Sequence, residues 1–165
     1  VIGIAGSIEK CRYAVEELGF DICINHRDED FVEQLQQAVP NGIDIYYENV
    51  GGKVFEAVWP LLNPASRIPI CGLVSQYNET EQAKGPDRLP NFISTILRKR
   101  IRMQGFIIFD DYASHYHEFN LQMSKWLKEG KINYKEHMVQ GLDNTIDAFN
   151  AMLKGNNFGK TVIKL

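Results

Sequence analysis

Short apolar runs alternate with amphipathic stretches along most of this chain. Runs of about four to eight apolar residues are typical of buried strands, whereas apolar positions about 3.6 residues apart are typical of helices. Strands are therefore predicted at residues 1–6, 20–25, 43–48, 67–72, 101–108 and 161–165, with a further extended segment at residues 134–141. Helices are predicted at residues 9–18, 28–39, 53–62, 91–99, 113–129 and 144–153.

Strands and helices alternate almost throughout this pattern. Because crossovers between parallel strands are right-handed, the alternation predicts a largely parallel sheet that helices cover on both faces. Such an α/β domain binds nucleotides at the carboxyl edge of its strands. The irregular segment from residue 73 to about residue 90 is long for a loop in a compact domain, and loops of this length are usually functional or mobile.

Residues 43–52 are predicted to form a strand, a tight turn and the start of a helix, and the other predicted elements are arranged around this stretch. Glu48 and Asn49 stand at the end of its strand, and the two glycines Gly51 and Gly52 permit a tight turn. Asn49 is expected to point its amide into the ligand crevice at the carboxyl edge of the sheet. The alternative is that Glu48 and Asn49 only close the turn.

Composition narrows the class of protein. A chain of 165 residues suits one domain with a substantial core, and a net charge of −3 with both signs interspersed indicates no nucleic-acid tail. No apolar run is long enough to span a membrane and no signal peptide is visible, so a cytoplasmic location is expected. The 3 cysteines are too widely spaced to predict disulfides or a zinc cluster, and no metal ion is expected.

The end of the first predicted strand is where a dinucleotide-binding sheet meets the adenosine ribose. Sites selective for NAD place an acidic residue there, but this chain has Gly6 and Ser7, with Lys10 one helical turn further on. A cation, a hydroxyl and helix amides together favour a 2′-phosphate and therefore NADP. The alternative is that Ser7 only caps the helix and that Lys10 is a solvated side chain.

The segment after residues 67–72 leaves its strand at the same edge of the sheet as Asn49. Gly72 allows the backbone to approach a planar ring, and Tyr77 offers a hydroxyl that can stabilise a developing enolate or pass it a proton. The alternative is that Tyr77 only packs against its neighbours.

Several nucleotide and catalytic motifs are absent from the sequence. The glycine fingerprint G-x-G-x-x-G occurs nowhere, so the first strand, glycine turn and helix of a dinucleotide fold are expected upstream of residue 1. The chain also lacks a Ser-His-Asp order, a phosphate loop of the G-x-x-x-x-G-K type and a His-Glu-x-x-His helix. Hydrolase and kinase functions therefore have no support.

Five segments, in the same order along the chain, resemble one family. They are Gly6-Ser7 with Glu9-Lys10, Glu48 to Gly52, Cys71 to Asn78, Gln104 to Ile107, and Leu153 to Thr161. They resemble the zinc-independent branch of the medium-chain dehydrogenase/reductases, the leukotriene B4 12-hydroxydehydrogenase/prostaglandin reductase group, and residues 85–90 are most similar to bacterial curcumin reductases. The resemblance implies a Rossmann-type doubly wound parallel sheet without its first strand and helix. Residues 1–165 would form the NADP-binding domain, and a GroES-like domain would precede them.

The resemblance also implies which residues bind the cofactor and which residue assists catalysis. Lys10 would hold the 2′-phosphate of NADP, residues 106–108 would pack at the nicotinamide, and Tyr77 would assist catalysis. The family usually has a tyrosine where this chain has His26, which leaves a cofactor contact at that position open. The candidate cofactor-binding residues are Ser7, Lys10, Asn49, Cys71, Gly72, Leu73, Val74, Ser75, Gln76, Tyr77, Phe106, Ile107, Ile108 and Asn157.

By resemblance the reaction is hydride transfer from NADPH to the β-carbon of an α,β-unsaturated ketone or aldehyde, followed by protonation at the α-carbon. The expected partners are a small-molecule enone or enal and a second copy of the chain in a homodimer, with no nucleic acid and no membrane. The alternative is a nucleotide-sensing or interaction module without catalysis.

The strand order of such a sheet makes one structural prediction. In the order 3-2-1-4-5-6, the first strand lies between the strand at residues 1–6 and the strand at residues 43–48, so these two should not be neighbours. Other residues, a partner chain or a rearranged sheet are expected to fill the gap. The isolated chain is expected to bind NADPH weakly and to reduce no enone.

Overall fold

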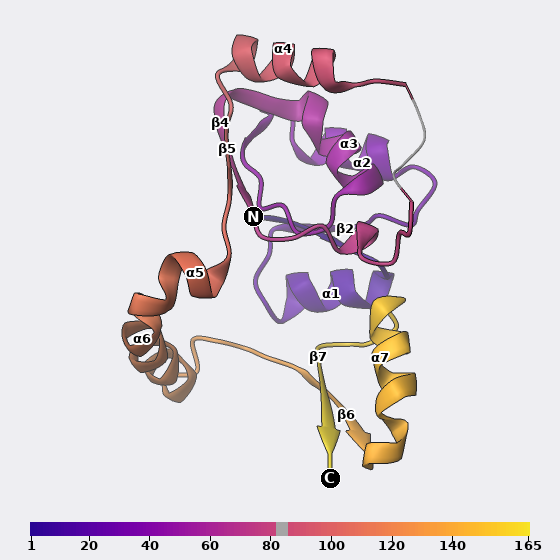
Figure 1. The fold of residues 1–165 in the computed structure, drawn as a ribbon, viewed down its shortest axis with the longest axis vertical. Helices are drawn as coiled ribbons and strands as arrows, with labels where there is room; N and C mark the ends of the chain where they lie inside the picture. Colours follow the sequence, from indigo (N-terminus) through magenta and orange to yellow (C-terminus); the bar gives the residue numbers. More distant parts are fainter. Residues whose placement is uncertain (82–85) are drawn as a thin grey trace. The chain divides into compact units, whose positions relative to one another are not determined.

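A computed structural model describes residues 1–81 and 86–165 (Figure 1). Every strand pair in this part of the chain is parallel. The strands are β1 (Ile2–Ala5), β2 (Ile22–Asn25), β3 (Ile43–Ile45), β4 (Leu62–Ile70), β5 (Arg102–Gly105), β6 (Glu136–Gln140) and β7 (Lys160–Lys164). The α-helices are α1 (Ile8–Glu16), α2 (Phe31–Ala38), α3 (Gly52–Val58), α4 (Leu89–Lys99), α5 (Ile108–Tyr112), α6 (Tyr116–Lys128) and α7 (Thr145–Leu153). Single 3-10 turns are η1 (Trp59–Leu61), η2 (Val74–Gln76), η3 (Ala113–His115) and η4 (Leu142–Asn144). Gly85, the first residue of the loop compared with curcumin reductases, lies outside the described residues.

The chain divides into two compact units, Val1–Asp28 with His117–Leu165 and Glu29–Tyr116. In the first unit β1 pairs with β2, and α1 packs on both strands. The α1 face that meets these strands buries Cys11 and Ala14. The same unit contains the β6 and β7 pair, and α7 contacts β7.

The second unit contains a three-stranded sheet in the order β3-β4-β5. The helix α3 contacts α2, and α4 contacts β4. Leu35, Val58, Leu62 and Ile68 form the centre of this core and are each at most 2% exposed. Burying a side chain of this size contributes about 1.5–3 kcal/mol relative to leaving it in water. This core holds the carboxyl ends of β3 and β4 in place.

The predicted sequence of elements is confirmed, but three boundaries are wrong near β4. The strand predicted at residues 43–48 is regular only at Ile43–Ile45, and Glu48 returns to the sheet through an isolated parallel bridge to Ile70. The helix predicted at residues 53–62 ends earlier because Pro60 has no N–H to continue the helical hydrogen bonds. Leu62 therefore starts β4 instead of ending the helix.

Two more differences follow β5. The strand predicted at residues 101–108 ends at Gly105, and Ile108 is instead the first residue of α5. The cause is local, because the carboxylate of Asp111 accepts a hydrogen bond from the backbone N–H of Ile107 at 2.7 Å and closes the first helical turn. The single helix predicted at residues 113–129 is divided into η3 and α6.

The prediction that the strands at residues 1–6 and 43–48 are not neighbours in a sheet is confirmed. The strands β1 and β3 belong to different sheets, whereas β1 pairs with β2 and β3 pairs with β4. Within residues 1–81 and 86–165, no helix is long and apolar enough to cross a membrane.

Candidate functional site

The turn after β3 is built around the buried carboxylate of Glu48, which is 1% exposed. Its Oε1 atom accepts hydrogen bonds from the backbone N–H groups of Val50 at 2.6 Å and Gly51 at 2.8 Å. The hydroxyl of Tyr46 donates to Oε2 at 3.1 Å. Burial raises the pKa of the Tyr46 hydroxyl, and the Glu48 carboxylate raises it further. Glu48 therefore closes the turn, as the alternative interpretation of this position predicted.

The loop after β4 is tied to this turn by four backbone hydrogen bonds. The N–H groups of Cys71 and Gly72 donate to the carbonyl of Glu48 at 2.8 Å and 3.4 Å. Those of Val74 and Ser75 donate to the carbonyls of Asn49 at 3.1 Å and Val50 at 3.0 Å. The two segments predicted to meet at the carboxyl edge, residues 48–52 and 71–77, are therefore neighbours in the structure.

Gly72 is the place where two predicted site residues converge. A Cβ atom built on Gly72 would lie 2.7 Å from Oδ1 of Asn49 and 2.8 Å from the hydroxyl oxygen of Tyr77. Only glycine leaves room for the amide and the hydroxyl at this point, since real Cβ contacts are longer than these distances. Asn49 is exposed and Tyr77 is 65% exposed, so both polar groups are accessible to a ligand.

Smaller and apolar groups surround this pair. The hydroxyl oxygen of Ser75 approaches the backbone of Gly51 and Gly52, at 3.3 Å and 3.2 Å from the Cβ positions of these two glycines. Interaction with the side chain of the exposed Cys71 raises the Tyr47 pKa, with burial adding to the shift. Leu73, Val74 and Gln76 complete the loop and are exposed.

Residues 106–108 leave the sheet beside the same loop. The N–H of Phe106 donates to the carbonyl of Ile70 at 3.2 Å, directly before Cys71. The Phe106 ring meets that of Tyr112 edge-on, with centroids 5.9 Å apart. Ile107 and Ile108 are 61% and 56% exposed, which leaves apolar side chains uncovered at this edge.

The other predicted residues lie in the first unit. Ser7 caps α1, since its hydroxyl oxygen accepts a hydrogen bond from the backbone N–H of Lys10 at 3.3 Å. The Lys10 ammonium donates to the carbonyl of Gly155 at 2.6 Å, so it is not a freely solvated side chain. Burial lowers the pKa of Lys10, and the charge of Arg27 lowers it further. The amide of Asn157 donates to the carbonyl of Gly159 at 2.8 Å.

His26 and Arg27, which are not among the predicted site residues, lie at the same end of β1. A Cβ atom on Gly6 would be 3.2 Å from Nε2 of His26 and 3.6 Å from Nε of Arg27. Their position directly after β2 was the available signal, because parallel neighbours place their carboxyl ends together and Ala5 pairs with Asn25. Only His26 was considered from sequence, as a replacement for the family's tyrosine.

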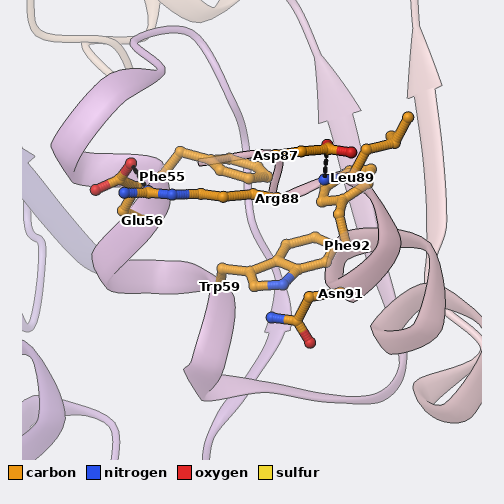
Figure 2. A pocket seen from close by; sticks show the side chains of 8 residues that line it. All are labelled: Phe55, Glu56, Trp59, Asp87, Arg88, Leu89, Asn91 and Phe92. Atoms are coloured by element: carbon orange, nitrogen blue, oxygen red, sulfur yellow. Dashed lines mark hydrogen bonds and ion pairs between the residues drawn. The ribbon is translucent and has the colours of Figure 1, made fainter. Parts of the chain in front are cut away.

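A separate cavity of about 580 Å³ lies in the second unit (Figure 2). One wall is aromatic, because the ring of Trp59 stacks on Phe92 with centroids 4.5 Å apart and on Phe55 at 5.3 Å. The opposing polar groups include an ion pair between Arg88 and Glu56. No predicted site residue lines this cavity. Among the residues with described positions, no group of three or more His, Cys, Asp or Glu side chains is arranged to hold a metal ion.

Comparison with known proteins identifies relatives of the whole chain. The sequence model of a family described as zinc-binding dehydrogenase matches residues 1–129. The chain is 59% identical, over 165 residues, to the NADPH-dependent curcumin reductase of Escherichia coli, covering 100% of this chain and 48% of that protein. It is 39% identical over 168 residues to the dehydrogenase FUB6 of Fusarium oxysporum, covering 100% of this chain and 46% of that one.

A solved structure is similar as well. The crystal structure of CurA from Vibrio vulnificus in complex with NADPH superposes with a TM-score of 0.95 at 60% identity, covering 99% of this chain and 49% of that chain. The chain thus spans about half the length of the relatives that it matches. These relatives confirm the resemblance to the reductase group and the Rossmann-type fold class predicted from the sequence.

Proposed function

The chain belongs to the zinc-binding dehydrogenase family, and we propose on that premise that residues 1–165 are the NADP-binding domain of an ene-reductase. The intact protein would use NADPH to reduce the carbon-carbon double bond of an α,β-unsaturated ketone or aldehyde. Support comes from two relatives at 59% and 60% identity, one described as an NADPH-dependent curcumin reductase and the other solved with NADPH. The enzyme is proposed to work without a metal ion.

The observation that carries this proposal is the convergence of Asn49 and Tyr77 on Gly72. The missing side chain of Gly72 leaves room for the Asn49 amide oxygen and the Tyr77 hydroxyl to lie close together over the backbone. Asn49 and Tyr77 are exposed, and Ile107 and Ile108 supply apolar surface beside the neighbouring strand. Small polar groups next to uncovered apolar side chains suit a nicotinamide ring and its amide.

Each part of the candidate set then has a role. When bound, NADPH would supply the hydride. Asn49 and the loop at residues 71–76 would orient the ring and its ribose, since their positions are held by the backbone bonds between the two segments. The hydroxyl of Tyr77 would donate a hydrogen bond to the substrate's carbonyl oxygen, where negative charge develops as the double bond is reduced.

The first unit would bind the adenosine end of the cofactor. Lys10 is proposed to hold the 2′-phosphate, with Ser7 and Asn157 as further cofactor contacts. The end of β1 carries Gly6 and Ser7 in place of the acidic residue that NAD-selective sites have there. The fit is therefore to NADP and not to NAD.

Two further properties belong to this proposal. The enzyme is proposed to be cytoplasmic, supported by its free cysteines, Cys11, Cys23 and Cys71. It is proposed to be a homodimer, supported by the edge strand β5, whose only partner in the described sheet is β4. Size-exclusion chromatography with light scattering on the intact protein measures the second property directly.

The test of the function is a titration of the intact protein with NADPH and NADH, followed by assays against a panel of enones and enals. We expect NADPH to bind at least about tenfold more tightly, because the 2′-phosphate adds charge-assisted hydrogen bonds. Lys10→Ala is expected to remove most of this preference. Preference for NADH would contradict the proposal, and NADPH binding without reduction of any enone would support a nucleotide-sensing module instead.

A further inference from the structure

Two cations from different elements are bound to consecutive carbonyl groups of one turn. Lys10 of α1 donates from Nζ to the carbonyl of Gly155 at 2.6 Å. Arg27, which follows β2, donates from Nη2 to the carbonyl of Lys154 at 3.2 Å. Gly155 has a φ of +73°, and a Cβ atom at this position would be only 3.4 Å from Nη2 of Arg27. The turn therefore holds both cations at the carboxyl end of the β1 and β2 pair.

The two positive charges are close enough to affect each other. After burial, the charge of Arg27 is the second cause of the lowered Lys10 pKa. Neither cation forms an ion pair in the part of the chain that the structure describes. Like charges held together without a counter-ion repel each other, and an anion placed between them removes that repulsion.

Both side chains keep donors for such an anion. An arginine has five N–H groups and a lysine three, whereas one hydrogen bond from each is used on the turn. The guanidinium also lies over Gly6, with Nε and Cζ at 3.6 Å and 3.8 Å from the Cβ position of that glycine. Gly6 has no side chain to cover the guanidinium, and the same Cβ position lies 3.2 Å from Nε2 of His26. A planar fork matches a phosphate group.

We propose that Arg27 is a second phosphate-binding cation beside Lys10 and determines specificity for NADP over NAD. This inference rests on the proposed function, because it assigns the 2′-phosphate to the pair. Lys10 acts as a point charge, whereas Arg27 supplies a two-pronged contact whose direction is set by its bond to the 154–155 turn. Removing the Arg27 side chain should therefore weaken the binding of NADPH and leave the binding of NADH almost unchanged.

The experiment compares Arg27→Gln with Arg12→Gln in the intact protein, using NADPH and NADH as probes. Arg12 is a matched control because it is an exposed arginine of α1, two residues and therefore about 200° around the helix from Lys10. We expect Arg27→Gln to weaken NADPH binding about ten- to a hundredfold and to change NADH binding by less than about threefold. Arg12→Gln should leave both dissociation constants unchanged.

The outcomes separate this inference from the proposed function. If the wild-type protein does not prefer NADPH, the proposed function itself is wrong and the inference falls with it. If the wild type prefers NADPH but Arg27→Gln keeps that preference, only the inference is wrong. A parallel loss of NADPH and NADH affinity, with a lower melting temperature, would show that Arg27 only braces the 154–155 turn.

A conservative variant gives a further readout. Arg27→Lys keeps the charge and loses the planar fork, so we expect NADPH affinity between those of the wild type and Arg27→Gln. The difference in NADPH affinity between the wild type and Arg27→Gln should also become smaller as the salt concentration is raised, because ions screen the interaction of exposed charges. Affinities that are equal for Arg27→Lys and Arg27→Gln, or that do not depend on salt, would overturn the assignment.

Discussion

The Oε1 atom of Glu48 accepts a hydrogen bond from the backbone N–H of Gly51 at 2.8 Å. The same atom accepts the N–H of Val50, so one carboxylate satisfies two backbone donors in a turn that carries the neighbouring Asn49. Because Glu48 is 1% exposed, water cannot replace it as an acceptor. The geometry of the candidate site therefore depends on a side chain that does not belong to the predicted set.

Glu48→Ala should destabilise the protein by about 3 kcal/mol or more, since two N–H groups lose their acceptor in a buried position. Tyr46→Phe removes only the 3.1 Å bond to Oε2 and should cost about 1 kcal/mol. Urea unfolding followed by circular dichroism measures both values. Equal costs for the two variants would show that the carboxylate does not organise the turn.

Gly72→Ala should weaken NADPH binding about tenfold or more while changing the free energy of unfolding by less than about 1 kcal/mol. The new methyl group would lie 2.7 Å from Oδ1 of Asn49 and 2.8 Å from the Tyr77 hydroxyl, so both groups must move. They are the ends of exposed side chains, which makes the movement cheap for the fold. Isothermal titration calorimetry measures the affinity.

Gly105→Ala is the matched control for that substitution. A Cβ atom on Gly105 has no neighbour within 4 Å among the described residues, and this glycine lies at the end of the adjacent strand β5. Its affinity for NADPH should stay within about twofold of the wild-type value, because no side chain has to move. If both variants lose affinity equally, the effect comes from stiffening the backbone and not from displacing Asn49 and Tyr77.

Tyr77→Phe should lower kcat for enone reduction about a hundredfold or more, because the hydroxyl is the proposed donor to the developing negative charge. The dissociation constant of NADPH should change by less than about threefold, since the ring of residue 77 remains. Stopped-flow measurement of NADPH oxidation gives the rate. Tyr134→Phe, at a tyrosine that is 70% exposed, is the control for losing a hydroxyl elsewhere.

Alkylation of the thiols should distinguish the three cysteines. Cys71 is exposed and should react first with iodoacetamide at pH 8, and bound NADPH should slow that reaction because the loop would then be covered. Burial, together with the neighbouring Cys11, raises the pKa of Cys23 to about 12, so Cys23 stays a neutral thiol and reacts slowly. Peptide mass spectrometry measures each rate. An unchanged Cys71 rate at saturating NADPH would contradict a cofactor contact at this loop.

The locations of the candidate residues at strand ends were predictable from the sequence, because parallel strands place their carboxyl ends at one edge of a sheet. Asn49 and Tyr77 were selected for this reason, and the structure brings both to Gly72. Turn closure by Glu48 was predicted as the alternative for this position, because its partners Val50 and Gly51 lie within three residues of it. The hydrogen bond of Arg27 was not predictable, because its partner is 127 residues away in the sequence.

Element boundaries show the same limit. Ser7 was correctly predicted as the cap of α1, because a cap and its donor lie within one turn of each other. Ile108 was wrongly placed in a strand, because a run of apolar residues does not reveal that Asp111 will bind the Ile107 N–H and start a helix.

The sequence by itself determined the α/β class, the parallel pairing and the residues offered at each strand end, since periodicity and local capping act over a few neighbouring positions. Only the tertiary structure decided which of those residues meet. The fold brings Asn49 and Tyr77 over Gly72, so that this position has room only for a glycine. It also brings Arg27 close to Lys10, because β1 and β2 end side by side. Contacts of this kind depend on distances between segments that no local pattern in a chain encodes.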